Sequence, residues 1–453
     1  MKKRFWLAAD AVVLCALGAQ AATPGLVLIS IDGMRPDYVT HASEHGLKIP
    51  HLLKLMNSGA YASGVHGVLP TVTYPSHTTL LTGVWPVEHG IYSNTTFDPL
   101  GKNMAGWYWY SEDNRAPTLW KAAADAGLKV GSVSWPVSVG APGVHFLIPE
   151  YWRASTDDDL KLERAISTPG LLTHLEKELG PYIIDLNHAI PGDHQRTRYS
   201  VAILKENQPD FMTIHLAALD HLEHLTAPFS KESNETLEEI DGMVGEIEDA
   251  MRVSHPQAVI CIVSDHGFTR IDHQLHLLSA FVDAGLVTLD PKSAAPKVMS
   301  WKAIPWNNGG SAAIMLQNPG DEGVRKQTAD LLARLAADPA NGIAGVLDEQ
   351  AIAKLGGPSQ AAFWVDMKSN FAVDAAVRKP LVAEISPRGT HGYSPDNPDL
   401  LASFFIEGPG IQRGLNLGQI DMRSIAPTLA HVLGVQFTTA TLPLLDLGGS
   451  GAK

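Results

Sequence analysis

The sequence predicts an α/β fold: a three-layer α/β/α sandwich around a central, largely parallel sheet. Apolar, β-branched runs typical of buried parallel strands alternate along the chain with amphipathic segments of helical length. The chain has 453 residues, of which 45% are hydrophobic and 18% are charged, and this composition is typical of a large folded globular protein. The predicted strands are 26–31, 130–134, 211–216, 258–263, 312–316 and 401–406. The predicted helices are 49–56, 76–82, 116–126, 171–179, 231–253, 324–336 and 422–433.

The first 21 residues have the pattern of a secretory signal. A basic start precedes a short apolar core at 7–17, and small residues lead up to a cleavage site near Ala21. The apolar core is shorter than the roughly 20 residues needed to span a bilayer. We therefore expect an exported protein, periplasmic or secreted, with no transmembrane segment in the mature chain. Cleavage leaves Cys261 as the single cysteine, so no internal disulfide is expected.

The remaining chain, 22–453, is predicted to form a single catalytic domain with two insertions. The segment at about 141–200 is less regular and carries an acidic run, and the segment at about 284–385 has joints rich in Gly and Pro. The formal net charge of -14 argues against a scaffold that binds nucleic acid through its phosphates. An acidic protein that handles phosphate groups needs metal ions to reverse the local charge.

The stretch 70–83 is a polar turn that leads into a short helix, with Ser76 as a plausible N-cap and Gly83 at its end. A hydroxyl near a helix N-terminus lies in positive partial charge, which favours a phosphate. Thr73 or Thr71 is therefore a candidate nucleophile, and Ser76 is a weaker one. The alternative is an ordinary capped turn rich in Ser and Thr.

Several predicted strands end in, or run into, a carboxylate or a histidine, and one further histidine lies in a loop flanked by glycines. Individually, each has an ordinary explanation as turn chemistry or a helix-surface pair. Together, three carboxylates and three imidazoles favour Zn²⁺ over Mn²⁺ or Mg²⁺. Two metal ions about 4 Å apart can hold the attacking and leaving oxygens on either side of a phosphorus. The six residues are Asp32, Asp220, His224, Asp265, His266 and His391.

These pieces occur in the order found in a known family, over roughly residues 26 to 435. The chain resembles the nucleotide pyrophosphatase/phosphodiesterase branch of the alkaline phosphatase superfamily, to which the ectonucleotide phosphodiesterases and autotaxin belong. The matching segments are Leu28-Ile-Ser-Ile-Asp-Gly33, Pro70-Thr-Val-Thr-Tyr-Pro-Ser-His77, Leu81-Thr-Gly83, 86–94, Trp120, Trp135-Pro136, Asp220-xxx-His224, Asp265-His-Gly267 and Gly389-Thr-His-Gly392.

The resemblance implies an alkaline-phosphatase-like fold and two bound Zn²⁺ ions. It also implies hydrolysis of phosphodiester or phosphoanhydride bonds through a threonine nucleophile and a covalent phosphothreonine. The family's motif aligns Thr73 with that nucleophile. Asn94 aligns with a donor to a phosphoryl oxygen, and Tyr74 with an aromatic that contacts the substrate. One zinc would be held by Asp32, Thr73, Asp265 and His266. The other would be held by Asp220, His224 and His391.

The substrate is left open by the sequence. Ser76 replaces an asparagine of the family, and no residue matches its second base-stacking aromatic. A phosphomonoesterase, with Lys102 or Arg153 as the extra cation, and a phosphonate hydrolase remain alternatives, as does a non-catalytic binder of metal or phosphate ligands. A sulfatase is disfavoured because no Cys-x-Pro-x-Arg or Ser-x-Pro-x-Arg motif occurs. We expect a small-molecule phosphodiester or nucleotide as the partner. Five further histidines, His77, His89, His215, His221 and His276, are expected to be structural or surface residues. His221 and Glu223 flank two of the predicted ligands.

Overall fold

A computed structural model describes residues 24–103, 106–151, 157–182, 190–439 and 441–448 of the chain. The predicted signal sequence lies outside these residues. An eight-stranded sheet organises the larger part of the molecule, in the order β18-β2-β17-β7-β1-β6-β4-β5. Its strands are β1 (Leu26–Ile31), β2 (Ala60–Tyr61), β4 (Val130–Val133), β5 (Phe146–Ile148), β6 (Phe211–Leu216), β7 (Val259–Val263), β17 (Phe404–Glu407) and β18 (Leu415–Asn416).

The centre of this sheet is parallel. β1 pairs in parallel with both β6 and β7, and β4 pairs in parallel with β5 and β6. β17 is antiparallel to both of its neighbours, β7 and β2. Strands buried on both faces need apolar residues at successive positions, and β1 with its sequence LVLISI satisfies this requirement.

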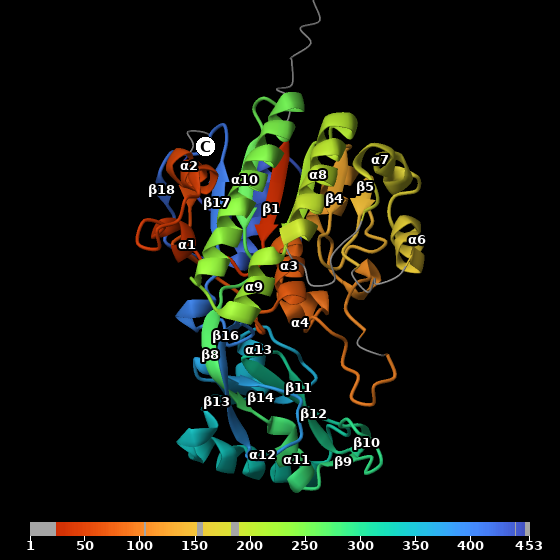
Figure 1. Cartoon of the computed structure of the whole chain (residues 1–453), viewed down its shortest axis with the longest axis vertical. Coiled ribbons are helices and arrows are strands. Elements are labelled where there is room, and N and C mark those ends of the chain that lie inside the picture. The colour runs from red at the N-terminus through yellow and green to blue at the C-terminus, as the bar shows by residue number, and fades with distance from the viewer. Residues whose placement is uncertain (1–23, 104–105, 152–156, 183–189, 440, 449–453) are drawn as a thin grey trace, which may run out of the picture.

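Helices cover both faces of the sheet (Figure 1), and the alternation of β1 side chains marks the two layers. Val27, Ile29 and Ile31 pack with the helices on one face, whereas Leu26 and Leu28 pack with those on the other. The first face holds α2 (Pro50–Ser58), α7 (Leu171–Leu179), α8 (Ile190–Asn207), α9 (Ala218–Thr226) and α10 (Lys231–Ser254). The second face holds α3 (Thr73–Thr82), α5 (Leu119–Asp125) and α14 (Ile425–Val432). The predicted three-layer α/β/α fold is confirmed.

The chain leaves the large sheet after β7 and returns to it at β17, and the segment between them forms a second lobe at the bottom of Figure 1. A four-stranded antiparallel sheet and a three-stranded sheet build this lobe around their own apolar core. The sheets consist of β11 (Ala303–Asn307), β12 (Ser311–Leu316), β14 (Ala361–Met367) and β13 (Ile343–Asp348), and of β15 (Asn370–Val373), β8 (Thr269–Leu275) and β16 (Val382–Thr390). The helices α11 (Leu277–Asp283), α12 (Glu322–Ala337) and α13 (Glu349–Lys354) accompany them.

The remaining elements are short or lie at the edges. They are α1 (Asp37–Thr40), β3 (Gly64–His66), α4 (Pro86–His89), α6 (Asp157–Ile166), β9 (Val287–Leu289), β10 (Val298–Trp301) and β19 (Gln419–Asp421), with short 3-10 turns between some of the elements. Among the described residues, no helix combines the length and apolar character needed to cross a bilayer.

Two local predictions were wrong. Ser76 is not an N-cap, because α3 already begins at Thr73 after the extended residue Val72, which places Ser76 inside the helix. Within the matching segment 86–94, Pro86 starts the helical turn α4. The segment 141–200 contains α6, α7 and the start of α8, and is thus more helical than predicted.

His89, at the end of α4, predicts an acid-sensitive contribution to stability. Its Nδ1 accepts a hydrogen bond from the Ile91 N–H, and its Nε2 lies 3.1 Å from Thr79 Oγ1, which itself donates to a carbonyl. The buried ring is therefore neutral, and burial lowers the pKa of His89 from 6.5 to about 3. Below pH 6.5 the unfolded chain binds a proton that the folded chain excludes, so folding weakens as the pH falls toward 3.

We expect this group to remove about 1.4 kcal/mol of the unfolding free energy for each pH unit below 6.5. Urea unfolding at a series of pH values should therefore give a steeper loss for the wild type than for His89→Gln. The two proteins should differ by a constant offset above pH 7.5, where this histidine no longer titrates in either state. Parallel curves at all pH values would contradict the assignment.

Candidate active site

The parallel pairing of the central strands brings the predicted ligands to one edge of the large sheet. Ser30 of β1 lies opposite His215 of β6 and Val263 of β7, so the chain leaves all three strands at the same edge. Asp32 directly follows β1, and Asp265 comes two residues after β7. Carboxyl ends of parallel strands are the usual ligand-binding edge of such sheets.

The first group of candidate ligands consists of Asp32, Asp265 and His266, all of them buried. His266 Nε2 lies 3.4 Å from Asp32 Oδ1 and 3.1 Å from Asp265 Oδ2. The other oxygen of Asp265 accepts a hydrogen bond from the Gly33 N–H. Thr73 Oγ1 lies 3.5 Å from the same His266 Nε2, so the first residue of α3 joins this group.

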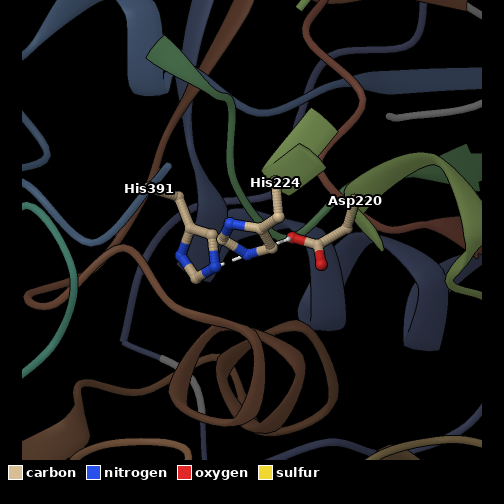
Figure 2. Close-up of side chains that lie close together, drawn as sticks. All are labelled: Asp220, His224 and His391. Carbon is tan, nitrogen blue, oxygen red and sulfur yellow. Dashed lines mark ion pairs between the residues drawn. The ribbon is translucent and has the colours of Figure 1, made fainter. Parts of the chain in front are cut away.

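The second group consists of Asp220, His224 and His391, and Figure 2 shows the three side chains close together. Asp220 and His224 lie one turn apart on α9, and His391 directly follows β16. Asp220 Oδ1 lies 3.5 Å from His224 Nε2 and 3.6 Å from His391 Nε2. The rings of His266 and His391 stack with their centroids 3.8 Å apart, which places the two groups side by side.

Backbone carbonyls fix the protons of all three histidines. His224 Nδ1 faces Gly389 O at 3.3 Å, His266 Nδ1 faces Gly267 O at 3.1 Å, and His391 Nδ1 faces Thr71 O at 3.1 Å. A carbonyl only accepts hydrogen bonds, so each Nδ1 carries the proton and each Nε2 lone pair faces the carboxylates. This is the tautomer of a metal-ligating histidine whose other nitrogen is oriented by a second partner.

The donor set fits divalent metal ions. One buried oxygen of each of the three carboxylates has no hydrogen-bond partner among the described residues: Asp32 Oδ1, Asp220 Oδ1 and Asp265 Oδ2. These are the oxygens that face the Nε2 lone pairs, so acceptors converge on acceptors with no proton between them. Such an arrangement is costly without a cation. Two groups of mixed carboxylates and imidazoles have the ligand chemistry of Zn²⁺.

Burial lowers the pKa of one candidate ligand, His391, and raises that of another, Asp32. Burial, together with His266 and His224, lowers the pKa of His391 well below its ordinary value, so the ring is neutral and its lone pair is available. Burial and the neighbouring Asp265 carboxylate raise the pKa of Asp32. The raised pKa means that the ionised form of Asp32 needs positive charge nearby.

Of the three candidate hydroxyls, Thr73 alone lies among the ligands. Thr71 Oγ1 donates instead to Tyr393 O, and Ser76 lies within α3 with a buried hydroxyl. Asn94 Nδ2 lies 3.4 Å from Thr73 Oγ1, and its Oδ1 accepts a hydrogen bond from the Tyr74 N–H. The nucleophile candidate and the predicted phosphoryl donor are therefore neighbours at the N-terminus of α3.

Tyr74 has no exposed surface. Its ring lies 5.3 Å from that of Trp107, which is half-buried, and its hydroxyl donates to Glu150 Oε1. A direct contact between Tyr74 and a substrate therefore requires its neighbours to move. The substrate-binding role of Tyr74 stays a prediction, and Trp107 is a partly exposed aromatic beside it.

A polar cluster that the sequence did not predict lies behind the first group. His215, treated there as structural, faces Asp32 Oδ2 at 3.0 Å and Glu150 Oε2 at 2.7 Å. His77 faces Thr73 O at 2.8 Å and lies 3.6 Å from Asp265 Oδ2. One feature of the sequence could have indicated His215: it is a titratable residue inside β6, a strand whose residues are all buried. Nothing in the sequence near Glu150 indicated its partner.

The comparisons with known proteins agree on one family. The model of the family described as "Type I phosphodiesterase / nucleotide pyrophosphatase" matches residues 26–394. Ectonucleotide pyrophosphatase/phosphodiesterase family member 1 of Homo sapiens is 27% identical over 253 residues, which cover 54% of this chain and 24% of that protein. The chain thus spans about a quarter of that relative. Bis(5'-adenosyl)-triphosphatase ENPP4 of Homo sapiens is 21% identical over 418 residues, covering 91% of this chain and 79% of that protein.

Among solved structures, human ectonucleotide pyrophosphatase/phosphodiesterase 5 matches with a TM-score of 0.64 at 18% identity. The match covers 93% of this chain and 99% of that chain. At this level of identity the likeness shows a shared fold. The predicted alkaline-phosphatase-like α/β fold is confirmed.

Gly392 provides a test of how the His391 loop is held. Its φ is +86°, and a Cβ there would lie 1.6 Å from Asn308 O, a backbone atom with little freedom to move. We expect Gly392→Ala to lower the unfolding free energy by roughly 2 kcal/mol or more and to weaken metal binding, because His391 is displaced.

Gly46 is a matched control, since it has a φ of +69° and nothing within 4 Å of the added Cβ. Gly46→Ala should cost only the backbone strain, about 1–2 kcal/mol, and should leave metal binding unchanged. Urea unfolding and a metal titration of both variants compare the two. Equal effects of the two substitutions would contradict the close packing of the His391 loop.

Proposed function

Because the chain belongs to the type I phosphodiesterase / nucleotide pyrophosphatase family, we propose that it is a zinc-dependent phosphodiesterase. Its substrates would be phosphodiesters or the phosphoanhydrides of nucleotides. The observation that carries this proposal is the position of Thr73, whose Oγ1 lies within 3.5 Å of both His266 Nε2 and Asn94 Nδ2. A hydroxyl, a ligand cluster and an amide donor thus meet at one point.

Two zinc ions are proposed as the cofactors. Asp32, Thr73, Asp265 and His266 would hold one ion, and Asp220, His224 and His391 would hold the other. Bound zinc would lower the pKa of the threonine hydroxyl and stabilise negative charge on the leaving oxygen. The unpartnered carboxylate oxygens and the Nε2 lone pairs described above support this assignment.

The residues of the chain would act as follows. Thr73 Oγ1 forms a bond to phosphorus as the bond from phosphorus to the leaving oxygen breaks, and the hydroxyl proton passes to solvent. The product is a covalent phosphothreonine, and the leaving oxygen takes up one proton from solvent in exchange for the proton that the hydroxyl lost. A water oxygen then bonds to phosphorus as the bond to Thr73 Oγ1 breaks, and one proton of that water returns to Thr73 Oγ1. Asn94 Nδ2 would donate to an equatorial phosphoryl oxygen, and the N-terminus of α3 adds positive partial charge there.

The same ligand set is compatible with related reactions. A phosphomonoesterase requires an additional cation for the second phosphoryl charge; Lys102 is exposed and Arg153 lies outside the described residues. A phosphonate hydrolase and a non-catalytic binding protein also remain to be separated by experiment. We further propose that residues 22–453 form a single catalytic domain and that the protein is exported after cleavage near Ala21.

A comparison of two chromogenic substrates tests the proposed reaction. Bis(nitrophenyl) phosphate is a diester and nitrophenyl phosphate is the matching monoester, and they share one leaving group. With zinc present, the diester should have the higher kcat/KM, because the structure offers no buried cation among the described site residues for a second phosphate charge. A preference for the monoester would indicate a phosphomonoesterase. Inactivity on both, with zinc bound, would indicate a binding protein.

Thr73→Ala tests the nucleophile. We expect this variant to lose diester hydrolysis while it still binds about two zinc ions per chain, because six other ligands remain. Thr71→Ala is the control, since its hydroxyl is bound to Tyr393 O outside the ligand cluster, and it should retain turnover. Hydrolysis by Thr73→Ala at the wild-type rate would exclude Thr73 as the nucleophile.

A further inference from the structure

A chain of buried hydrogen bonds runs behind the first ligand group, through residues to which the proposed reaction gives no role. The Tyr74 hydroxyl donates to Glu150 Oε1 at 2.7 Å. Glu150 Oε2 lies 2.7 Å from His215 Nδ1, and His215 Nε2 lies 3.0 Å from Asp32 Oδ2. All four side chains are less than 5% exposed. These hydrogen bonds therefore run through the protein interior, away from solvent, from α3 to the end of β1.

This series of hydrogen bonds ends at Asp32, where the two carboxylate oxygens have different neighbours. Oδ2 lies 3.0 Å from His215 Nε2, whereas Oδ1 has no hydrogen-bond partner among the described residues and faces His266 Nε2. A carboxylate held through one oxygen presents the other in a fixed direction. Hydrogen bonds of this kind orient metal-ligating carboxylates and tune their affinity.

The other end of this series of hydrogen bonds is Tyr74, the residue next to the proposed nucleophile. Tyr74 directly follows Thr73 at the start of α3, and its backbone N–H donates to Asn94 Oδ1. Glu150 itself is fixed, because its backbone N–H donates to Ser138 Oγ. The side chains of Glu150 and His215 thus connect two elements, β1 and α3, that are far apart in the sequence.

We propose that Glu150 and His215 are positioning residues that fix Asp32 as a metal ligand and set its place relative to the start of α3, with the Tyr74 hydroxyl as the outer anchor. This inference rests on the proposed function, since it assigns Asp32 to a metal site. It predicts that removing a single hydroxyl at Tyr74, which lies outside the ligand cluster, weakens zinc binding at Asp32.

Zinc affinity, measured by competition with a chromophoric chelator, tests the proposal without relying on turnover. We expect His215→Gln and Glu150→Gln each to lower the affinity for one of the two zinc ions, the one held by Asp32, by roughly 10- to 100-fold. Tyr74→Phe keeps the aromatic ring and should lower the affinity for the same zinc ion by roughly 2- to 10-fold. The effects of Tyr74→Phe and Glu150→Gln should not add in the double variant, because both break one chain.

His276→Gln is a matched control. His276 is another buried histidine that bonds a carboxylate, Asp374, at 2.7 Å, but it lies in the second lobe. It should lower thermal stability to an extent comparable with His215→Gln and leave both zinc affinities unchanged. If His215→Gln does not fold, Tyr74→Phe decides the question, since its single lost hydroxyl leaves the packing intact.

The outcomes separate this inference from the proposed function. A wild-type protein that binds fewer than two zinc ions, or that fails to cleave the diester, would overturn the proposed function. A wild-type protein that does both, with Tyr74→Phe and Glu150→Gln binding zinc as the wild type does, would overturn the positioning role alone. A fall in kcat for the diester at unchanged KM in Tyr74→Phe would support it, because the buried ring and its packing remain.

Discussion

The parallel pairing of β1 between β6 and β7 is the constraint on which the rest of the structure depends. It ends three strands at one edge, and Asp32, Asp265 and the start of α9 all follow from that edge. The polar side chains at the ends of these apolar strands are buried as well, because helices cover both faces of the sheet. The candidate ligands are thus both fixed in position and costly to desolvate, because both effects come from burial.

The surrounding polar groups offset this cost in an ordered way. Backbone carbonyl oxygens accept hydrogen bonds from Nδ1 of the three candidate ligand histidines. One oxygen of Asp32 bonds to His215, and one oxygen of Asp265 accepts from the Gly33 N–H. Among the described residues, one oxygen of each of the three carboxylates is left without a hydrogen-bond partner, and these oxygens face the Nε2 atoms of the histidines. Acceptors that converge in this way favour a bound cation.

The sequence predicted the fold class, and each strand and helix that it predicted overlaps an observed one, because the hydrophobic period is a local signal. The candidate ligands at the strand ends could also be picked out from the sequence, since a carboxylate after a buried strand is visible without knowing its partners, and their role as ligands stays a prediction. Ser76 was misplaced because backbone conformation at Val72, rather than hydroxyl content, sets where α3 begins. β8 and β16 were missed because their residues are largely polar and pair over long separations in sequence: β8 pairs with β16 and with β15, each about a hundred residues away. Glu150 has a role only through contacts that no local pattern encodes.

The second lobe bears directly on the site, because the turn between β11 and β12 holds two of its parts. Asn308 Oδ1 accepts a hydrogen bond from Ser93 Oγ, next to Asn94, and the Gly310 N–H donates to His391 O. Gly392 packs so closely on Asn308 O that no side chain fits between them. One ligand of the second group and the proposed phosphoryl donor therefore share a support that belongs to neither the large sheet nor its helices. A lobe that only covered the site would not need these contacts, so its position in the fold is that of a brace.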